Sequence, residues 1–221
     1  MSNFWTKTKS VLKKIVEDYL KFPLHLMTSP IRGYTEFKED KKGKLSVGIV
    51  FLVLASLLTI IRYNYDGIII NVNNPEKFNS VKLLIYTVTP VIILSIANWS
   101  ITTLMNGKGK MKEIFTMGCY CYFPYIVIGI LNLILSNILT VDEVQFITLL
   151  NILAYVLMGY MIFMGMIVIH EYGVFQTLLT VILTLLATCV ILFIALLIFD
   201  LTQQIYGFFY SLYKEIVSRF F

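Results

Sequence analysis

Five long apolar runs constrain the fold of this chain more than any other feature of its sequence. About 20 consecutive apolar residues in a helix cross the roughly 30 Å hydrocarbon core of a bilayer. Each run is close to this length or longer. The sequence therefore predicts an all-α integral membrane bundle of five transmembrane helices, over residues 45–61 (continuing to about 65), 83–105, 114–139, 146–169 and 174–199.

The composition favours a membrane protein over the alternative of a very apolar soluble helical protein. Hydrophobic residues make up 58% of the chain and charged residues 14%, whereas a soluble domain is about half apolar and about a quarter charged. None of the five runs has a face polar enough to meet water. The three cysteines, Cys119, Cys121 and Cys189, lie inside the runs, and we expect them to be buried and reduced.

Basic residues are concentrated before the first run and in the loop between the second and third runs. That loop, residues 106–113, contains Lys108, Lys110 and Lys112, whereas the loop at residues 140–145 contains two acids and no base. Lysine and arginine accumulate on the cytoplasmic side of membrane proteins. The distribution predicts a multi-pass cell-membrane protein with a cytoplasmic N-terminus, an outside C-terminus and contacts to the anionic inner leaflet.

Amphipathic segments flank the predicted spans and divide the chain into residues 1–44, 45–200 and 201–221. In residues 1–22, apolar side chains fall on one half of a helical wheel and charged side chains on the other. A basic amphipathic helix with aromatic residues is typical of helices that lie in a membrane surface, and packing on a partner protein is the alternative. We expect Pro23 to end this helix. The last segment predicts a second amphipathic helix, resting on the outer surface.

The loop that contains Gly107-Lys108-Gly109-Lys110 has the residue types of a phosphate-binding loop but not its pattern. That pattern is G-x-x-x-x-G-K-[ST] between a strand and a helix. Here one residue separates the glycines, Met111 stands where Ser or Thr is needed, and an apolar run precedes the loop. We therefore predict a tight cytoplasmic turn rather than a nucleotide site. We also expect no nucleic-acid partner.

Motifs for catalysis or metal binding are weak in this sequence. His170-Glu171 begins like the zinc motif H-E-x-x-H, but the second histidine is absent, and we expect the two side chains to pair at the end of the fourth span. The sequence has no G-x-S-x-G motif and no pair of carboxylates deep in the spans. We therefore expect no catalytic residue, cofactor or metal. Pro90 and Pro124 are expected to kink the second and third spans.

Three stretches of the chain are similar to the motifs of one family. They are SPIRGYTEFKEDKKGKL (29–45), NWSITTLMNGKGKMKEIFTMGCYCYFPYI (98–126) and HEYGVFQTLLTVILTLL (170–186). On these residues the chain resembles the Yip-domain membrane proteins, in particular their Gram-positive bacterial branch. The resemblance implies five helices with a cytoplasmic N-terminus. It also implies, as candidate partners, the components of carbohydrate ABC importers beside which some bacterial members sit.

We expect a non-enzymatic membrane scaffold or adaptor that acts through protein and lipid contacts. An accessory subunit of a carbohydrate ABC importer, bound to permease components, is one alternative, and a passive channel or carrier is another. Self-association into a homo-oligomer is a further expectation. The candidate interaction surface consists of polar segments that we expect to converge on one cytoplasmic face, with Pro30, Gly33, Glu36, Lys38, Asn98, Trp99, Gly107, Lys108, Gly109, Lys110, Glu113, Pro124, His170 and Tyr172.

Individual roles on this surface follow from residue type. Gly107 and Gly109 are expected to permit the tight turn. Lys108 and Lys110 are expected to meet lipid headgroups or an acidic partner. Trp99 is expected to anchor the membrane interface. Further ion pairs are expected between Glu113 and a nearby base and in a network with Glu36 and Lys38.

Overall fold

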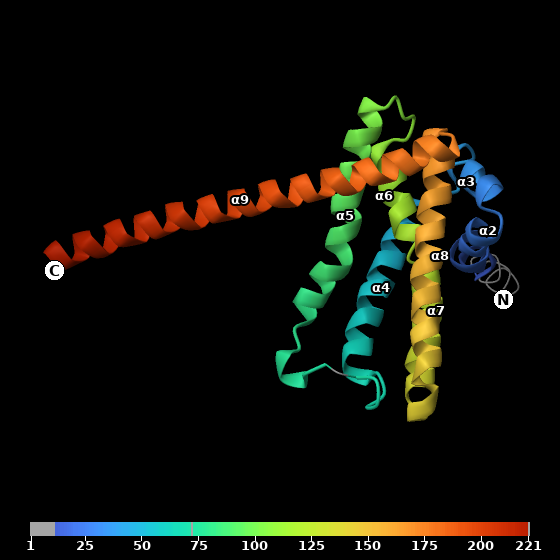
Figure 1. Cartoon of the computed structure of the whole chain (residues 1–221), viewed down its shortest axis with the longest axis horizontal. Coiled ribbons are helices and arrows are strands. Elements are labelled where there is room, and N and C mark those ends of the chain that lie inside the picture. Colours follow the sequence, from blue (N-terminus) through green and yellow to red (C-terminus); the bar gives the residue numbers. More distant parts are fainter. Residues whose placement is uncertain (1–11, 72, 221) are drawn as a thin grey trace, which may run out of the picture.

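The computed structural model describes residues 12–71 and 73–220, and the regular elements within these ranges are helices. Five helical segments are long and apolar enough to span a membrane, which confirms the predicted fold class. These segments are α4 (Leu45–Tyr65), α5 (Ser80–Leu104), the pair α6 (Met111–Tyr120) and α7 (Phe123–Ser136), α8 (Val144–His170) and α9 (Val174–Phe220) (Figure 1).

Shorter elements join these helices at the two ends of the bundle. Before the first span lie η1 (Glu17–Lys21), α2 (Phe22–Thr28) and α3 (Pro30–Lys38), and two single turns, η2 (Pro75–Lys77) and η3 (Val141–Glu143), lie in loops. The end that holds residues 38–44, 105–110 and 171–173 is called the motif end. The other end, with residues 66–79 and 137–143, is called the opposite end (Figure 1).

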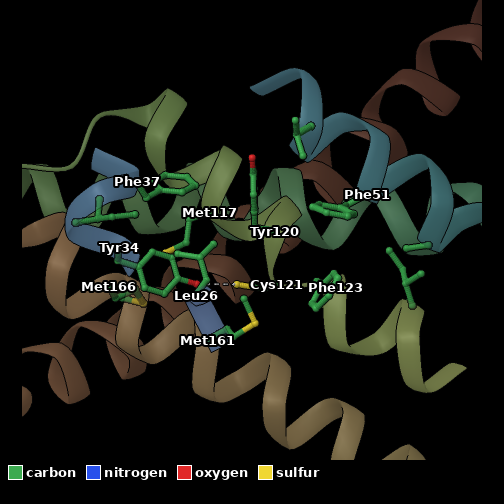
Figure 2. Packing of buried hydrophobic residues seen from close by; sticks show 14 residues of the cluster. Leu26, Tyr34, Phe37, Phe51, Met117, Tyr120, Cys121, Phe123, Met161 and Met166 are labelled. Carbon is green, nitrogen blue, oxygen red and sulfur yellow. Dashed lines mark hydrogen bonds between the residues drawn. The ribbon is translucent and has the colours of Figure 1, made fainter. Parts of the chain in front are cut away.

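An aromatic core joins α2 and α3 to the spanning helices. The ring of Tyr120 in α6 lies 5.4 Å from Phe37 of α3 and 5.4 Å from Phe51 of α4, edge to face in both pairs. Figure 2 shows these rings with Tyr34, whose hydroxyl lies 3.9 Å from the Cys121 sulfur. Edge-to-face pairs contribute about 0.5–1.5 kcal/mol each beyond the area that they bury. The segment before the first span is therefore part of the bundle.

The helix before Pro23 differs from the prediction. Residues 12–28 form one continuous helical stretch that passes through Pro23, so the prediction that Pro23 ends the helix is wrong. The wider turns of η1 come just before Pro23, which lies in the first turn of α2. Tyr19 and Phe22 pack against the core. Residues 1–11 of the predicted amphipathic helix lie outside the described residues.

The third span is interrupted, and the two prolines behave differently. A turn at Cys121 and Tyr122 separates α6 from α7, and Pro124 lies in the first turn of α7. The kink predicted at Pro124 is confirmed, because a proline there blocks continuation of the preceding helix. Pro90 lies inside α5, which runs through it from Ser80 to Leu104.

The last helix also differs from the prediction. A separate helix was expected over residues 201–221, but α9 continues without a break from Val174 to Phe220. Its 47 residues extend about 70 Å, more than twice the thickness of the hydrocarbon core. Gly207 is the weakest helix former among the described residues of its distal part, and a single glycine lowers helix stability by only about 1 kcal/mol.

The two halves of α9 have different surroundings. Its first half contacts α5 and α8, whereas every described side chain from Leu192 to Arg219 is exposed. In Figure 1 the helix crosses α5 and then leaves the bundle. Cys189, which was expected to be buried, is exposed on this helix, while Cys119 and Cys121 are buried as expected.

Candidate functional site

An ion-pair network ties together three segments that are far apart in the sequence. Glu171, in the α8–α9 turn, accepts from Lys38 Nζ of α3 at 2.8 Å and from Lys108 Nζ of the α5–α6 loop. Lys38 Nζ also donates to the backbone carbonyl of Ile169 at 2.9 Å. The three predicted polar segments therefore converge at the motif end, as expected from the sequence.

Glu171 is the centre of this network because of its backbone. It is the C-terminal cap of α8, with φ 57° and ψ 41° in the left-handed region. This conformation turns the chain out of the helix and exposes the carboxylate to both lysines. The hydrogen bonds from Lys108 and Lys38 lower the pKa of Glu171 from 4.5 to about 2.

His170 points away from Glu171, so the predicted His–Glu pair is wrong. The His170 ring is buried, and its Nε2 lies 3.0 Å from Asn98 Oδ1 of α5. The amide nitrogen of Asn98 donates to Thr184 Oγ1 of α9 at 3.2 Å. The Asn98 oxygen must therefore accept, and His170 Nε2 carries the hydrogen. His170 Nδ1 finds no hydrogen-bond partner among the described residues.

The two loop glycines are required for close packing rather than for an unusual backbone conformation. Neither has a positive φ, and the left-handed residue of the loop is Asn106, with φ 58°. A Cβ on Gly107 would lie 2.5 Å from the Tyr172 hydroxyl, and one on Gly109 would lie 2.6 Å from His170 Cε1. The predicted role of these glycines in the turn is corrected accordingly.

Tyr172 closes the site from the α8–α9 turn. Its ring stacks on His170 with centroids 5.3 Å apart. Its hydroxyl donates to the carbonyls of Met105 at 3.2 Å and Thr102 at 3.4 Å, at the C-terminal end of α5. Burial raises the pKa of the Tyr172 hydroxyl, which keeps it protonated as a donor. The loop at residues 105–110, called the glycine loop, is thus fixed against α5 and α8.

Two predicted sets of ion pairs do not form. Glu113 accepts the backbone N–H of Lys110 at 3.0 Å and caps α6, so it pairs with a backbone group rather than with a base. Glu36 pairs with Lys42 at 2.8 Å, and this hydrogen bond lowers the pKa of Glu36. Lys38 instead pairs with Glu171, so the predicted network of Glu36 with Lys38 is wrong.

The remaining predicted residues lie around or outside this cluster. Pro30 begins α3, and Gly33 lets α3 approach α2, because a Cβ there would lie 3.0 Å from Leu26 Cα. Trp99 is half-exposed on α5. Pro124 lies at the start of α7, in a different part of the fold. The cluster itself contains seven of the predicted residues: Lys38, Asn98, Gly107, Lys108, Gly109, His170 and Tyr172.

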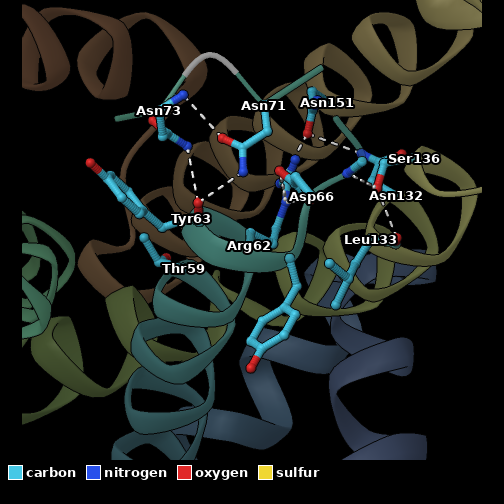
Figure 3. Close-up of polar contacts among 12 residues, drawn as sticks. Thr59, Arg62, Tyr63, Asp66, Asn71, Asn73, Asn132, Leu133, Ser136 and Asn151 are labelled. Atoms are coloured by element: carbon cyan, nitrogen blue, oxygen red, sulfur yellow. Dashed lines mark hydrogen bonds and ion pairs between the residues drawn. The ribbon is translucent and has the colours of Figure 1, made fainter. Parts of the chain in front are cut away.

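Sequence reasoning missed a second polar cluster, at the opposite end of the bundle. Arg62 Nε lies 3.3 Å from Asp66 Oδ2, and Arg62 Nη1 donates to Asn151 Oδ1 at 3.2 Å. Asn132 Nδ2 donates to the same Asn151 oxygen at 3.0 Å (Figure 3). The spacing of Arg62 and Asp66, four residues apart at the end of an apolar run, was the one available signal.

Several polar groups at the motif end contact other segments of the chain. Among the described residues, no group of three or more His, Cys, Asp or Glu side chains is arranged to hold a metal ion. The carboxylate of Glu171 and the Nε2 of His170 are both engaged by groups of the chain itself.

Comparison with known proteins gives one match. A family model described as the Yip1 domain matches residues 24–213, which include all three converging segments. No curated protein and no solved structure matches the chain.

Proposed function

Because the chain belongs to the Yip1 domain family and has five helices that can span a membrane, we propose that this multi-pass membrane protein acts as a non-enzymatic scaffold or adaptor. Its docking surface is the motif end, around the exposed side chains of Lys110 and Lys112. The partners are other membrane proteins and anionic lipid headgroups.

The observation that carries this proposal is the rigid construction of the motif end. Lys38 and Lys108 both bind Glu171, and His170 binds Asn98. A general base or nucleophile needs a group that is free to reach a substrate, whereas these groups hold helices together. A surface of fixed shape is what a docking site needs, because less ordering is required when a partner binds.

The exposed lysines of this surface favour negatively charged partners. Lys110 and Lys112 are exposed beside the network, and the α6 carboxylate nearest to them, Glu113, is occupied as a helix cap. We place the motif end on the cytoplasmic side of the cell membrane, with the N-terminus inside and the C-terminus outside, because the basic loops lie there. Each lysine near an anionic surface contributes about 1 kcal/mol to the attraction.

The test is quantitative purification of the full chain from native membranes in a mild detergent. The variant K110Q/K112Q removes two exposed positive charges of the docking surface. K77Q/K82Q is the matched control, because it removes two exposed lysines at the opposite end. At about 1 kcal/mol per lysine, partner binding should weaken about 30-fold in the first variant and stay unchanged in the control.

The identity of the retained protein decides between the alternatives. A permease component that is lost with K110Q/K112Q identifies the chain as an importer accessory that docks through the motif end. Equal recovery of every co-purifying membrane protein with the wild type and both variants would rule out the motif end as a docking surface.

A further inference from the structure

A large apolar cavity lies among the helices beneath the motif end. Its volume is about 490 Å³, and its walls come from α5, α6, the α6–α7 turn, α8 and α9. Most of the lining side chains are aliphatic, aromatic or sulfur-containing, such as Leu94, Met117, Phe163 and Val181. Pockets of this size hold small organic ligands, and an apolar wall selects for a hydrocarbon part of the ligand.

The cavity follows from the arrangement of the helices. α5 and α8 each contact both α6 and α9, and side chains from all four helices line the space between them. The interiors of proteins are close-packed, and voids much larger than a water molecule are few. A cavity of this size that opens into hydrocarbon is therefore a place for an apolar ligand.

The opening of the cavity faces the side of the bundle. Gly159 of α8 lines the cavity and is exposed, and a Cβ added to it would meet nothing within 4 Å. Pro90 of α5 and Leu185 of α9 also line the cavity and are exposed. In a membrane-spanning bundle, exposed apolar side chains at this depth face lipid tails. A lipid tail can thus enter laterally, without passing through water.

The other end of the cavity is polar and lies next to positive charge. Ser95, Asn98 and Thr184 line it where the Asn98–His170 contact begins. Ile114 also lines it, and its backbone N–H bonds to the carbonyl of Lys110, one helical turn earlier. The exposed Lys110 therefore lies one helical turn above Ile114, and the exposed Lys112 follows two residues later in the first turn of α6. A headgroup would lie at this end of the cavity if the chain of a lipid filled the space below.

We propose that this cavity binds one acyl chain of an anionic membrane phospholipid, with its headgroup beside Lys110 and Lys112. This proposal rests on the proposed function, because the headgroup would use Lys110 and Lys112 of the docking surface. The cavity adds a site for the acyl chain, with apolar walls that lie within the bundle. The bound lipid would be a stoichiometric part of the protein rather than a member of the surrounding lipid shell.

Two substitutions test the site. Gly159→Leu obstructs the opening, and Gly118→Leu fills the floor, where a Cβ would lie 3.3 Å from Val91 Cγ1. Gly207→Leu is the matched control, because Gly207 also lies within a helix with nothing within 4 Å of an added Cβ, but in the distal half of α9. Replacing a glycine in a helix raises helix propensity, so Gly159→Leu and the control should both keep their fold.

The measurement is native mass spectrometry of the full chain after stepwise delipidation in detergent, with added dioleoyl phosphatidylglycerol as the probe. We expect about one tightly retained lipid per chain in the wild type and in Gly207→Leu, and little or none in Gly159→Leu and Gly118→Leu. Retention equal to the wild type in either cavity variant overturns the proposal. Size-exclusion profiles and unfolding midpoints show whether each variant is folded.

A headgroup comparison tests the second half of the proposal. Phosphatidylglycerol should be retained more tightly than dioleoyl phosphatidylcholine, by about fivefold for each lysine that faces the headgroup. Equal retention of the two lipids overturns the anionic preference. Since Gly159→Leu leaves Lys110 and Lys112 in place, failure of this site and failure of the docking surface give different results in the two experiments.

Discussion

The two ends of the bundle are held together in different ways. At the motif end, the Lys38–Glu171–Lys108 network joins segments that are distant in sequence, and the Lys108 and Glu171 side chains are 66% and 49% exposed. At the opposite end, Arg62 and Asp66 are one helical turn apart and are 16% and 13% exposed. Water and ions screen exposed charges strongly and buried charges weakly.

The polar contacts at the two ends therefore have different effects: those at the motif end align segments of the chain, and those at the opposite end stabilise the fold. The exposed network of the motif end sets how α3, the glycine loop and the α8–α9 turn are placed, and contributes little to the free energy of unfolding. The buried cluster of the opposite end holds α4, α7 and α8 together, and removing one of its members leaves a buried group without a partner. Substitutions at the opposite end should therefore be the more destabilising ones.

The largest effect is expected at the close approaches of glycine. A Cβ on Gly67 would collide with the backbone carbonyl of Ser136, which cannot move without shifting α7. Gly67→Ala should therefore destabilise the protein by about 3 kcal/mol. Gly107→Ala at the motif end should cost less, about 1 kcal/mol, because its Cβ would meet side-chain atoms of Tyr172, His170 and Thr102 rather than backbone. The thermal unfolding midpoint in detergent measures both.

If Gly107→Ala lowered the unfolding midpoint more than Gly67→Ala, the proposed difference between the two ends would be wrong. Gly207→Ala is the control for the substitution itself. It lies in the exposed half of α9 with nothing near its added Cβ, and it should raise helix stability slightly.

An intermediate loss of stability is expected when either of two asparagine side chains, Asn151 or Asn98, is removed. Asn151→Ala removes the acceptor of both Arg62 and Asn132, and should destabilise the protein by about 2 kcal/mol. Asn98→Ala should cost about 1 kcal/mol, because one N–H, that of His170, loses its acceptor. Denaturant unfolding of the two variants under one set of detergent conditions gives the comparison. Equal losses would mean that the two ends depend on buried polar contacts to the same degree.

The smallest effect is expected from Glu171, and it depends on pH. Its pKa is about 2 in the folded protein, below the ordinary 4.5. The stabilising contribution of the carboxylate is therefore complete above about pH 4.5, and is lost as the pH falls towards 2. The variant Glu171→Gln lacks this charge at every pH. The small difference in unfolding midpoint between the two proteins should be present at pH 6 and shrink as the pH is lowered to about 3.

A difference that stays constant from pH 6 to pH 3 would show that the charge of Glu171 does not stabilise the fold. Lys42→Gln serves as a second reference, because Lys42 pairs with Glu36 and takes no part in the network around Glu171. That substitution should leave the pH dependence caused by Glu171 in place.

Several features of the fold could be predicted because they depend on local chemistry. The five spanning segments follow from apolar length, and the break near Pro124 follows from a missing N–H. The convergence of the three polar segments was also predicted, since loops on the same side of a membrane bundle lie at the same end. The end of the last helix was not predictable in this way, because nothing between residues 199 and 202 stops a helix.

Contacts between residues that are far apart in the sequence decided the rest. His170 and Glu171 are adjacent in the chain, and the left-handed conformation of Glu171 sends one side chain inward to Asn98 and the other outward to two lysines. Apolar length, charge distribution and proline positions thus determined that this protein is a five-span helical bundle with a polar motif end. Which polar groups meet, why the glycines are needed, and where the cavity lies depend on how α5, α6, α8 and α9 pack, and only the tertiary structure shows that packing.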